Sequence, residues 1–279
     1  MGQTDNLSPS PRNGEARRRA WRPGVAIWLS AGVHLSALIA LLAQPQWWPS
    51  ILATLVLNHV ALALIGLWPR SRLLGINMLR LPEAAAARKE ISLTFDDGPD
   101  PDVTPKVLDI LDSHHATASF FVIGDKAAAH PELIREIVKR GHSIENHSRR
   151  HSHVFGLFGW AALRKDVGTA QEIVAGITGQ APTFFRSPMG IRNPMLDPVI
   201  AQFGLRYITW TRRGFDTVTS DSAVVLARLS RNLSAGDILL LHDRPTHGQR
   251  AIVLEVLPAL LDRIAASGLK PVSLPAAMQ

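Results

Sequence analysis

Cysteine is missing from the whole 279-residue chain. Its absence excludes a disulfide scaffold, a thiolate zinc finger and a cysteine nucleophile, although it does not fix the cellular compartment. Glycine and proline are present at ordinary levels, 20 and 19 residues, and 46% of the residues are hydrophobic, which excludes a collagen-like or fully disordered chain. The length allows one domain of about 200 residues with an extension, or two small domains.

Acidic residues are scarce in the first third of the chain. Residues 1–89 contain ten Lys and Arg against three Asp and Glu, which accounts for the whole net charge of +7. Residues 90–279 contain twenty of each sign and are neutral. A nucleic-acid-binding protein would have its positive charge on the folded domain, whereas here the excess flanks two apolar stretches. We therefore expect no nucleic-acid partner.

Two uncharged runs, residues 25–44 and residues 51–68, lie in this basic region. About 20 apolar residues span the ~30 Å hydrocarbon core of a bilayer. Five of the seven tryptophans lie here, most of them near the ends of the runs, as at a membrane interface: Trp21, Trp28, Trp47, Trp48 and Trp68. A cleaved signal peptide is the alternative for the first run, but the run is too long, lacks a cleavage site and is followed at once by the second. The pattern predicts a transmembrane helical hairpin.

The arginines predict how this hairpin is oriented. They precede the first run and follow the second, whereas the loop between the runs has no charge. The positive-inside rule then places both ends in the cytoplasm. We expect a two-pass protein of the bacterial inner (plasma) membrane that contacts the bilayer through residues 25–68 and has a cytoplasmic C-terminal domain. His34, Asn58 and His59 would lie within the membrane, where such residues either pack between helices or form a functional polar site.

Composition divides the chain into four segments. We expect a disordered basic N-terminus at residues 1–22, two transmembrane helices at 23–72, a linker at 73–88 and a folded domain at 89–279. From residue 90 on, β-rich runs alternate with amphipathic helical stretches, which is typical of parallel strands. Polar residues gather just after several of these runs, where such folds place active sites. The sequence predicts an α/β fold, with a barrel favoured over a doubly wound sheet.

Two acidic residues end the first β-rich run. Because side chains alternate across a strand, Asp96 and Asp97 are expected to diverge and to take different roles. The following Gly-Pro makes the same segment a good turn sequence, so a capped turn is the alternative interpretation.

His147 and His151 are four residues apart, a spacing at which a helix or a tight loop places both imidazoles on one side. Two histidines and one carboxylate, with positions open to water and substrate, describe a catalytic divalent-metal site. A solvated, histidine-rich surface is the alternative. Zinc is the first expectation for such ligands, and cobalt, nickel, iron and manganese also suit them.

Three further polar residues follow later strand-like runs. Arg186 could hold a carboxylate through two parallel hydrogen bonds. Asp216 comes after the run RYITW, and His242 ends a run in which Leu240 shares its face. For each residue alone, a surface ion pair or a satisfied histidine is the simpler interpretation.

In order and spacing, these motifs resemble the polysaccharide deacetylase family (NodB homology domain, carbohydrate esterase family four) over residues 89–275. The matching segments are Thr94-Phe95-Asp96-Asp97-Gly98-Pro99, His147-Ser148-x-x-His151 after Asn146, Arg186-Ser187-Pro188-Met189-Gly190 and Leu240-x-His242. Met189 stands where the family usually has an aromatic residue. The family's fourth motif, close to Asp-x-x-Asp-Trp, reads Arg213-Gly214-Phe215-Asp216-Thr217 here. Both departures reduce the aromatic wall expected along a glycan groove.

The resemblance implies a distorted (β/α) barrel of the NodB type and a deacetylase that holds one divalent metal ion. It assigns Asp97, His147 and His151 as metal ligands, Asp96 as general base oriented by Arg186, His242 oriented by Asp216 as general acid, and Pro188, Gly190 and Leu240 as substrate-binding residues. Leu240 would line the pocket for the acyl methyl group.

The expected function is removal of an N-acetyl or N-formyl group from an amino sugar. With the domain in the cytoplasm, a lipid-linked or other glycan precursor is the expected substrate. An extracytoplasmic deacetylase of cell-wall or capsular N-acetylglucosamine polymer is the alternative. A hypothesis of another class is an inactive carbohydrate-binding protein held in the membrane.

Overall fold

The computed structural model describes residues 19–246, 248 and 250–279. Most of the expected disordered segment, residues 1–18, therefore lies outside the described residues. Just after it, the backbone N–H of Arg19 donates a hydrogen bond to the carbonyl of Ala201, 3.0 Å away, so the chain contacts the domain before it enters the first long helix.

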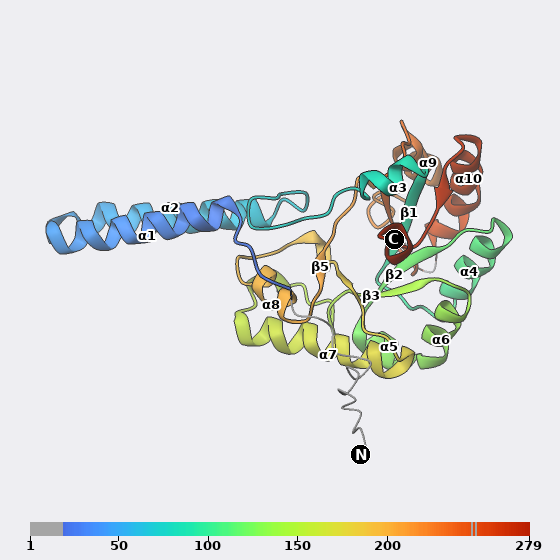
Figure 1. Cartoon of the computed structure of the whole chain (residues 1–279), viewed down its shortest axis with the longest axis horizontal. Coiled ribbons are helices and arrows are strands. Elements are labelled where there is room, and N and C mark those ends of the chain that lie inside the picture. The colour runs from blue at the N-terminus through green and yellow to red at the C-terminus, as the bar shows by residue number, and fades with distance from the viewer. Residues whose placement is uncertain (1–18, 247, 249) are drawn as a thin grey trace, which may run out of the picture.

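Two long apolar helices extend from the domain as a paired rod (Figure 1). α1 (Val25–Ala43) and α2 (Trp48–Gly66) are joined by a short 3-10 turn, and both are long and apolar enough to cross a membrane. Asn58 donates a hydrogen bond to Ser30 Oγ at 2.9 Å, and the rings of His34 and His59 meet edge to face at 5.3 Å. These four polar residues thus link the two helices.

The domain is built on a curled, entirely parallel sheet that forms a half-barrel. The strands are β1 (Glu90–Asp96), β2 (Ala118–Val122), β3 (Ser143–Asn146), β4 (Phe184–Phe185), β5 (Arg206–Tyr207), β6 (Arg212–Arg213), β7 (Ile238–His242) and β8 (Lys270–Pro271). Their order is β5-β4-β3-β2-β1-β7-β6, with β8 paired to the start of β1. The predicted α/β class and distorted barrel are confirmed. The run RYITW, expected as one strand, forms only the two residues of β5.

Helices cover the outside of the sheet and separate successive strands. They are α3 (Glu83–Ala87), α4 (Thr104–Ser113), α5 (Gly124–Ala129), α6 (Pro131–Lys139), α7 (Trp160–Thr178), α8 (Leu196–Gln202), α9 (Ser222–Ser230), α10 (Ile252–Ala266) and α11 (Leu274–Ala277). Local chemistry sets several of their ends. Asp221 accepts backbone N–H bonds from Ala223 and Val224 at the start of α9, and α7 is capped after Thr178 by Gly179, whose φ of 74° suits glycine.

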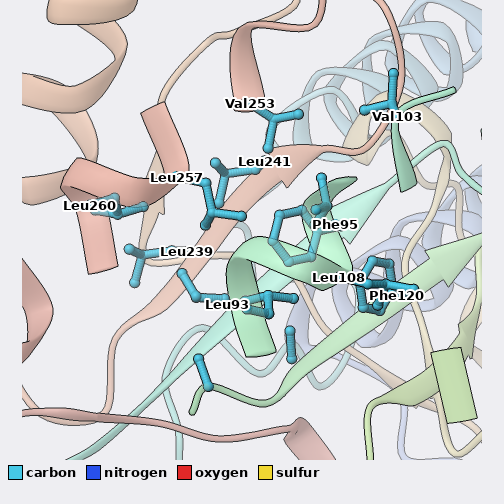
Figure 2. Packing of buried hydrophobic residues seen from close by; sticks show 14 of the residues in the cluster. Leu93, Phe95, Val103, Leu108, Phe120, Leu239, Leu241, Val253, Leu257 and Leu260 are labelled. Carbon is cyan, nitrogen blue, oxygen red and sulfur yellow. The ribbon is translucent and has the colours of Figure 1, made fainter. Parts of the chain in front are cut away.

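The main core lies between the central strands and the helices α4 and α10 (Figure 2). β1 and β7 are buried along almost their whole length, as expected for strands covered on both faces. The Phe95 and Phe120 rings stack at 5.0 Å between neighbouring strands. This packing fixes the carboxyl ends of β1 and β7, where polar side chains follow.

The expected linker, residues 73–88, is packed against the domain. Met78 pairs with Ile208 beyond β5, and the Leu81 N–H donates to the Gly236 carbonyl just before β7. Arg80 forms an ion pair with the buried Asp237 at 2.6 Å. We call residues 78–81 the bridging segment, because it fills the gap between the two ends of the half-barrel.

The base of the hairpin touches the loop that follows β4. The Arg192 N–H donates to the Gly66 carbonyl at the end of α2, 3.1 Å away. Gly190 has a φ of 74°, and a Cβ there would lie 2.7 Å from Pro69, so only glycine fits without displacement. The third sequence motif therefore lies directly against the hairpin.

Candidate active site

A pocket of about 180 Å³ opens at the carboxyl ends of β1, β3 and β7. Parallel strands bring their carboxyl ends to one edge, which is where α/β folds place their sites. Among the candidate residues, Asp96, Asp97, His147, His151, Gly190, Leu240 and His242 line this pocket. Arg186 and Asp216 lie behind its wall, and Pro188 is buried outside the lining.

Asp96 and Asp97 converge on the pocket, which corrects the expectation that they diverge. The strand ends at Asp96, and Asp97 has a left-handed φ of 74°. The alternation of side chains stops there, so both carboxylates face His147: its Nε2 is 3.8 Å from Asp96 Oδ2 and 3.3 Å from Asp97 Oδ1. The two acids nevertheless have different partners.

His147 and His151 lie on a tight loop after β3, one of the two placements that the sequence allowed. The loop turns sharply because Ser148 and His151 have φ values of 69° and 50°. His147 Nδ1 donates to the Arg186 carbonyl at 2.8 Å, which leaves its Nε2 to face the pocket. His151 Nε2 lies 3.1 Å from Asp97 Oδ1.

These three side chains fit a divalent metal ion. One ligand atom from each of Asp97, His147 and His151 lies within 4.8 Å of the other two. Asp97 Oδ1 is buried between the two imidazole nitrogens and makes no regular hydrogen bond. One carboxylate oxygen and two imidazole nitrogens are the ligand atoms that a zinc-like ion binds, and such an ion would give the buried oxygen the partner that it lacks. The other oxygen, Asp97 Oδ2, accepts from Arg244 at 2.8 Å.

Asp96 is held by a buried arginine. Arg186 Nη1 donates to Asp96 Oδ1 at 2.6 Å and to Thr94 Oγ1 at 2.9 Å, while Nη2 donates to the Thr209 carbonyl. The expected pair of parallel bonds to one carboxylate is wrong, because the second amino group is used by the backbone. Asp96 Oδ2 is thereby left to face the pocket.

His242 ends β7 and is fixed by Asp216. Asp216 follows β6, and its Oδ1 lies 2.9 Å from His242 Nδ1. Its other oxygen accepts the backbone N–H of His242, also at 2.9 Å. The imidazole is therefore held at both its ring and its backbone, with Nε2 left to face the pocket.

Burial and charge shift the pKa values of these groups in opposite directions. Burial lowers the pKa of His151 to about 4, which favours the neutral imidazole that a metal requires. Burial alone would raise the pKa of Asp97, but the surrounding histidines hold it well below its usual range. Burial would also lower the pKa of His242, yet the Asp216 carboxylate outweighs it and raises that pKa. The protonated form of His242 is thus favoured over that of a free imidazole.

Sequence reasoning missed several residues of the pocket wall. Trp210, Arg213, Thr217, Arg244 and His153 line it. Trp210 supplies an aromatic surface although the tryptophan of the fourth motif is absent, and the Arg213 guanidinium stacks between Trp210 and Phe215 at 5.3 and 4.9 Å. The clue was a tryptophan and an arginine within a few residues of Asp216.

Comparisons with known proteins agree with this geometry. The polysaccharide deacetylase family model matches residues 83–208. A peptidoglycan-N-acetylglucosamine deacetylase of Bacillus cereus is 30% identical over 200 residues, which cover 69% of each chain. A chitooligosaccharide deacetylase of a Bradyrhizobium strain is 37% identical over 163 residues, which cover 56% of this chain and 71% of that protein.

A solved structure shares the fold. The crystal structure of a peptidoglycan N-acetylglucosamine deacetylase in complex with a hydroxamate-type ligand superimposes with a TM-score of 0.66 at 26% identity, covering 72% of this chain and 92% of the other. The half-barrel and its pocket thus define a hydrolase of carbon–nitrogen bonds other than peptide bonds. The chain belongs to the polysaccharide deacetylase family.

Proposed function

We propose that this chain is a membrane-anchored, metal-dependent enzyme that hydrolyses the N-acetyl or N-formyl group of an amino sugar carried on a lipid-linked glycan precursor. The observation that carries the proposal is the position of the pocket against the hairpin. Gly190 lines the pocket and packs on Pro69, and Arg192 bonds to the end of α2. A substrate in this pocket would lie beside the membrane surface.

Asp97, His147 and His151 would hold the metal, with zinc as the first choice. When bound, the ion supplies a Lewis acid for the amide carbonyl and makes a water molecule acidic enough to react near neutral pH. The three residues lie together in the wall of the pocket.

Asp96 is assigned as the general base. It needs to be correctly oriented to accept a proton from water, and its bond to the fully buried Arg186 guanidinium provides this orientation. The remaining oxygen faces the pocket beside His147.

His242 is assigned as the general acid. Asp216 holds its Nδ1 and favours the charged imidazolium, so Nε2 can give a proton to the departing amine. Leu240, two residues earlier on the same face of β7, lines the pocket where a small acyl methyl group would lie.

The cytoplasmic face of the bacterial inner membrane is the proposed location. Two exposed apolar helices of membrane-spanning length and the arginines on their outer flanks support it. Cell-wall polymer would be out of reach from that side, which leaves lipid-linked intermediates as substrate.

The names of the relatives favour a second candidate. The Bacillus cereus and Bradyrhizobium proteins are named for peptidoglycan N-acetylglucosamine and chitooligosaccharide. If only one of the two apolar runs crosses the bilayer, the domain lies outside, and cell-wall or capsular N-acetylglucosamine polymer becomes the substrate.

A reporter experiment separates the two candidates. Alkaline phosphatase and a fluorescent protein are fused separately to the C-terminus and compared in intact bacteria. A fluorescent, phosphatase-silent result supports the inward-facing enzyme, and lipid-linked intermediates extracted from a deletion strain should then carry an extra acetyl or formyl mass. An active phosphatase would overturn the cytoplasmic proposal and favour the polymer.

A further inference from the structure

A second and larger hollow lies where the hairpin joins the domain. It has a volume of about 670 Å³, within the about 300–1,000 Å³ of typical ligand sites. One wall is the second half of α2, through His59, Leu62, Ala63 and Leu67, and the other is formed by the loops 153–159 and 191–195. We call it the hairpin groove.

The hairpin groove is apolar and its domain side is unusually exposed. Leu157, Val154 and Met195 line it with exposed fractions of 84%, 54% and 47%. A soluble domain buries such side chains or places them where a ligand, partner or membrane covers them. Here they face a helix whose own apolar residues are exposed along its length.

The hairpin groove adjoins the catalytic pocket. His153 lines both, and the loop after β4 passes from one to the other, with Met189 and Gly190 in the pocket and Ile191 and Arg192 in the groove. A molecule with a sugar at one end and an apolar chain at the other could occupy both at once. From Leu67 to His59 the groove follows α2 for about 12 Å at 1.5 Å per residue, toward the interior of the proposed bilayer.

We infer that the hairpin groove binds the hydrocarbon chain of the lipid-linked amino-sugar substrate and so positions the sugar over the catalytic pocket. This inference rests on the proposed function and adds the site that selects the lipid carrier. Because the groove shares His153 and the loop after β4 with the catalytic pocket, the substrate's chain is favoured over a bilayer phospholipid, whose acyl chains need not reach the active site.

Photolabelling tests this inference without requiring turnover. The full-length protein in phospholipid nanodiscs is irradiated with a polyprenyl-diphosphate-linked N-acetylglucosamine that carries a diazirine on its chain. Mass spectrometry should place the label on residues 153–159, on residues 191–195 or on the second half of α2. Excess unlabelled probe should remove the label. Labelling spread evenly along both helices, or removed equally well by excess phospholipid, would overturn the inference in favour of ordinary bilayer contact.

Matched variants give the second readout. Leu157→Gln and Met195→Gln change exposed groove residues, and Val138→Gln changes an exposed valine on α6, outside the groove. We expect the two groove variants to lose about tenfold in labelling and to raise KM for the lipid-linked sugar about tenfold, because each loses apolar contact. Deacetylation of a soluble N-acetylchitooligosaccharide should be unchanged in all three.

The outcomes separate this inference from the proposed function. If the wild-type protein releases acetate from the lipid-linked sugar but the groove variants behave like Val138→Gln, the groove inference fails and the proposed function stands. If the wild-type protein acts only on the soluble oligosaccharide and takes no label in the groove, both the lipid-linked substrate and the groove inference fail.

Discussion

Asp216 holds His242 through both of its carboxylate oxygens, one on the imidazole Nδ1 and one on the backbone N–H, each at 2.9 Å. The first bond orients the ring and favours its protonated form. The second bond fixes the Asp216 carboxylate to the backbone at the end of β7. The fourth motif has lost its other acidic residue and its tryptophan, yet it keeps the carboxylate on which the proposed general acid depends.

Replacing these two residues should affect catalysis without affecting the metal. We expect His242→Ala to lower kcat by roughly 10²–10⁴-fold. Asp216→Asn should lower kcat less, by about 10–100-fold, because the acid remains but is poorly oriented. Since Asp216 raises the pKa of His242, activity falls as pH rises through that pKa, and Asp216→Asn should move this alkaline limb to lower pH. An unmoved limb in the pH profile of kcat/KM would contradict the role given to Asp216.

Metal content should separate the proposed base from the proposed ligands. Asp96→Asn should lose about 10²–10⁴-fold in turnover while keeping its metal, because Asp96 bonds to Arg186 and lies outside the ligand cluster. His147→Ala should lose the metal together with activity. Inductively coupled plasma mass spectrometry of the purified proteins measures both. A native protein without metal would favour an inactive carbohydrate-binding protein, and an active Asp96 variant would exclude the proposed base.

A buried histidine away from the pocket should make stability depend on pH. His142 accepts a hydrogen bond from the Ala118 N–H at 3.2 Å and packs against Phe120, and burial lowers its pKa to about 4. The unfolded chain takes up this proton near pH 6.5, whereas the folded protein does not until about pH 4. Stability is therefore lost as pH falls across this window, by about 3 kcal/mol at most.

The difference between wild type and His142→Gln isolates this contribution. Glutamine keeps an acceptor for Ala118 and does not titrate, so the variant should lose less stability between pH 6.5 and pH 4, as measured by denaturant midpoints. His115→Asn serves as control, since His115 is exposed and has a φ of 50° that asparagine tolerates. Equal pH slopes in the wild type and His142→Gln would contradict the assignment.

The contact between the hairpin base and the third motif can be tested at glycine. Gly190 and Gly179 share a φ of 74°, but a Cβ at Gly190 meets Pro69 and Trp210 within 3 Å, whereas nothing lies within 4 Å at Gly179. Alanine should strain the backbone equally at both positions. The overlap at Gly190 should cost an additional ~1–3 kcal/mol and reduce activity, since the loop must move. Equal losses of Tm in the two variants would show that the contact is unimportant.

The chemistry-bearing residues could be predicted because each falls at the end of a strand. Asp96, His147 and His242 follow β-rich runs, and the order of their motifs sufficed to group them before any distance was known. The convergence of Asp96 and Asp97 could not be predicted, because a single left-handed residue cancels the alternation of a strand. Nor could the partners of Arg186, since one of them is a backbone carbonyl.

Short or bridging elements were the least predictable part of the fold. β4, β5 and β6 have two residues each, too few to give a periodic pattern. Residues 73–88 looked like a linker because their partners, such as Ile208 and Gly236, are far away in sequence.

The bridging segment also determines when, during synthesis, the fold of the domain can close. Arg80 has its ion-pair partner 157 residues later, at Asp237, and the central strand β1 pairs with residues of β7 that follow 146 residues later, as Ser92 does with Ile238. At about 5–20 residues per second, a ribosome needs roughly 8–30 s to cover that distance. On the proposed topology, the hairpin is already in the bilayer during this interval. The enzyme therefore completes its half-barrel while tethered, and its fold closes at the membrane surface where we place its substrate.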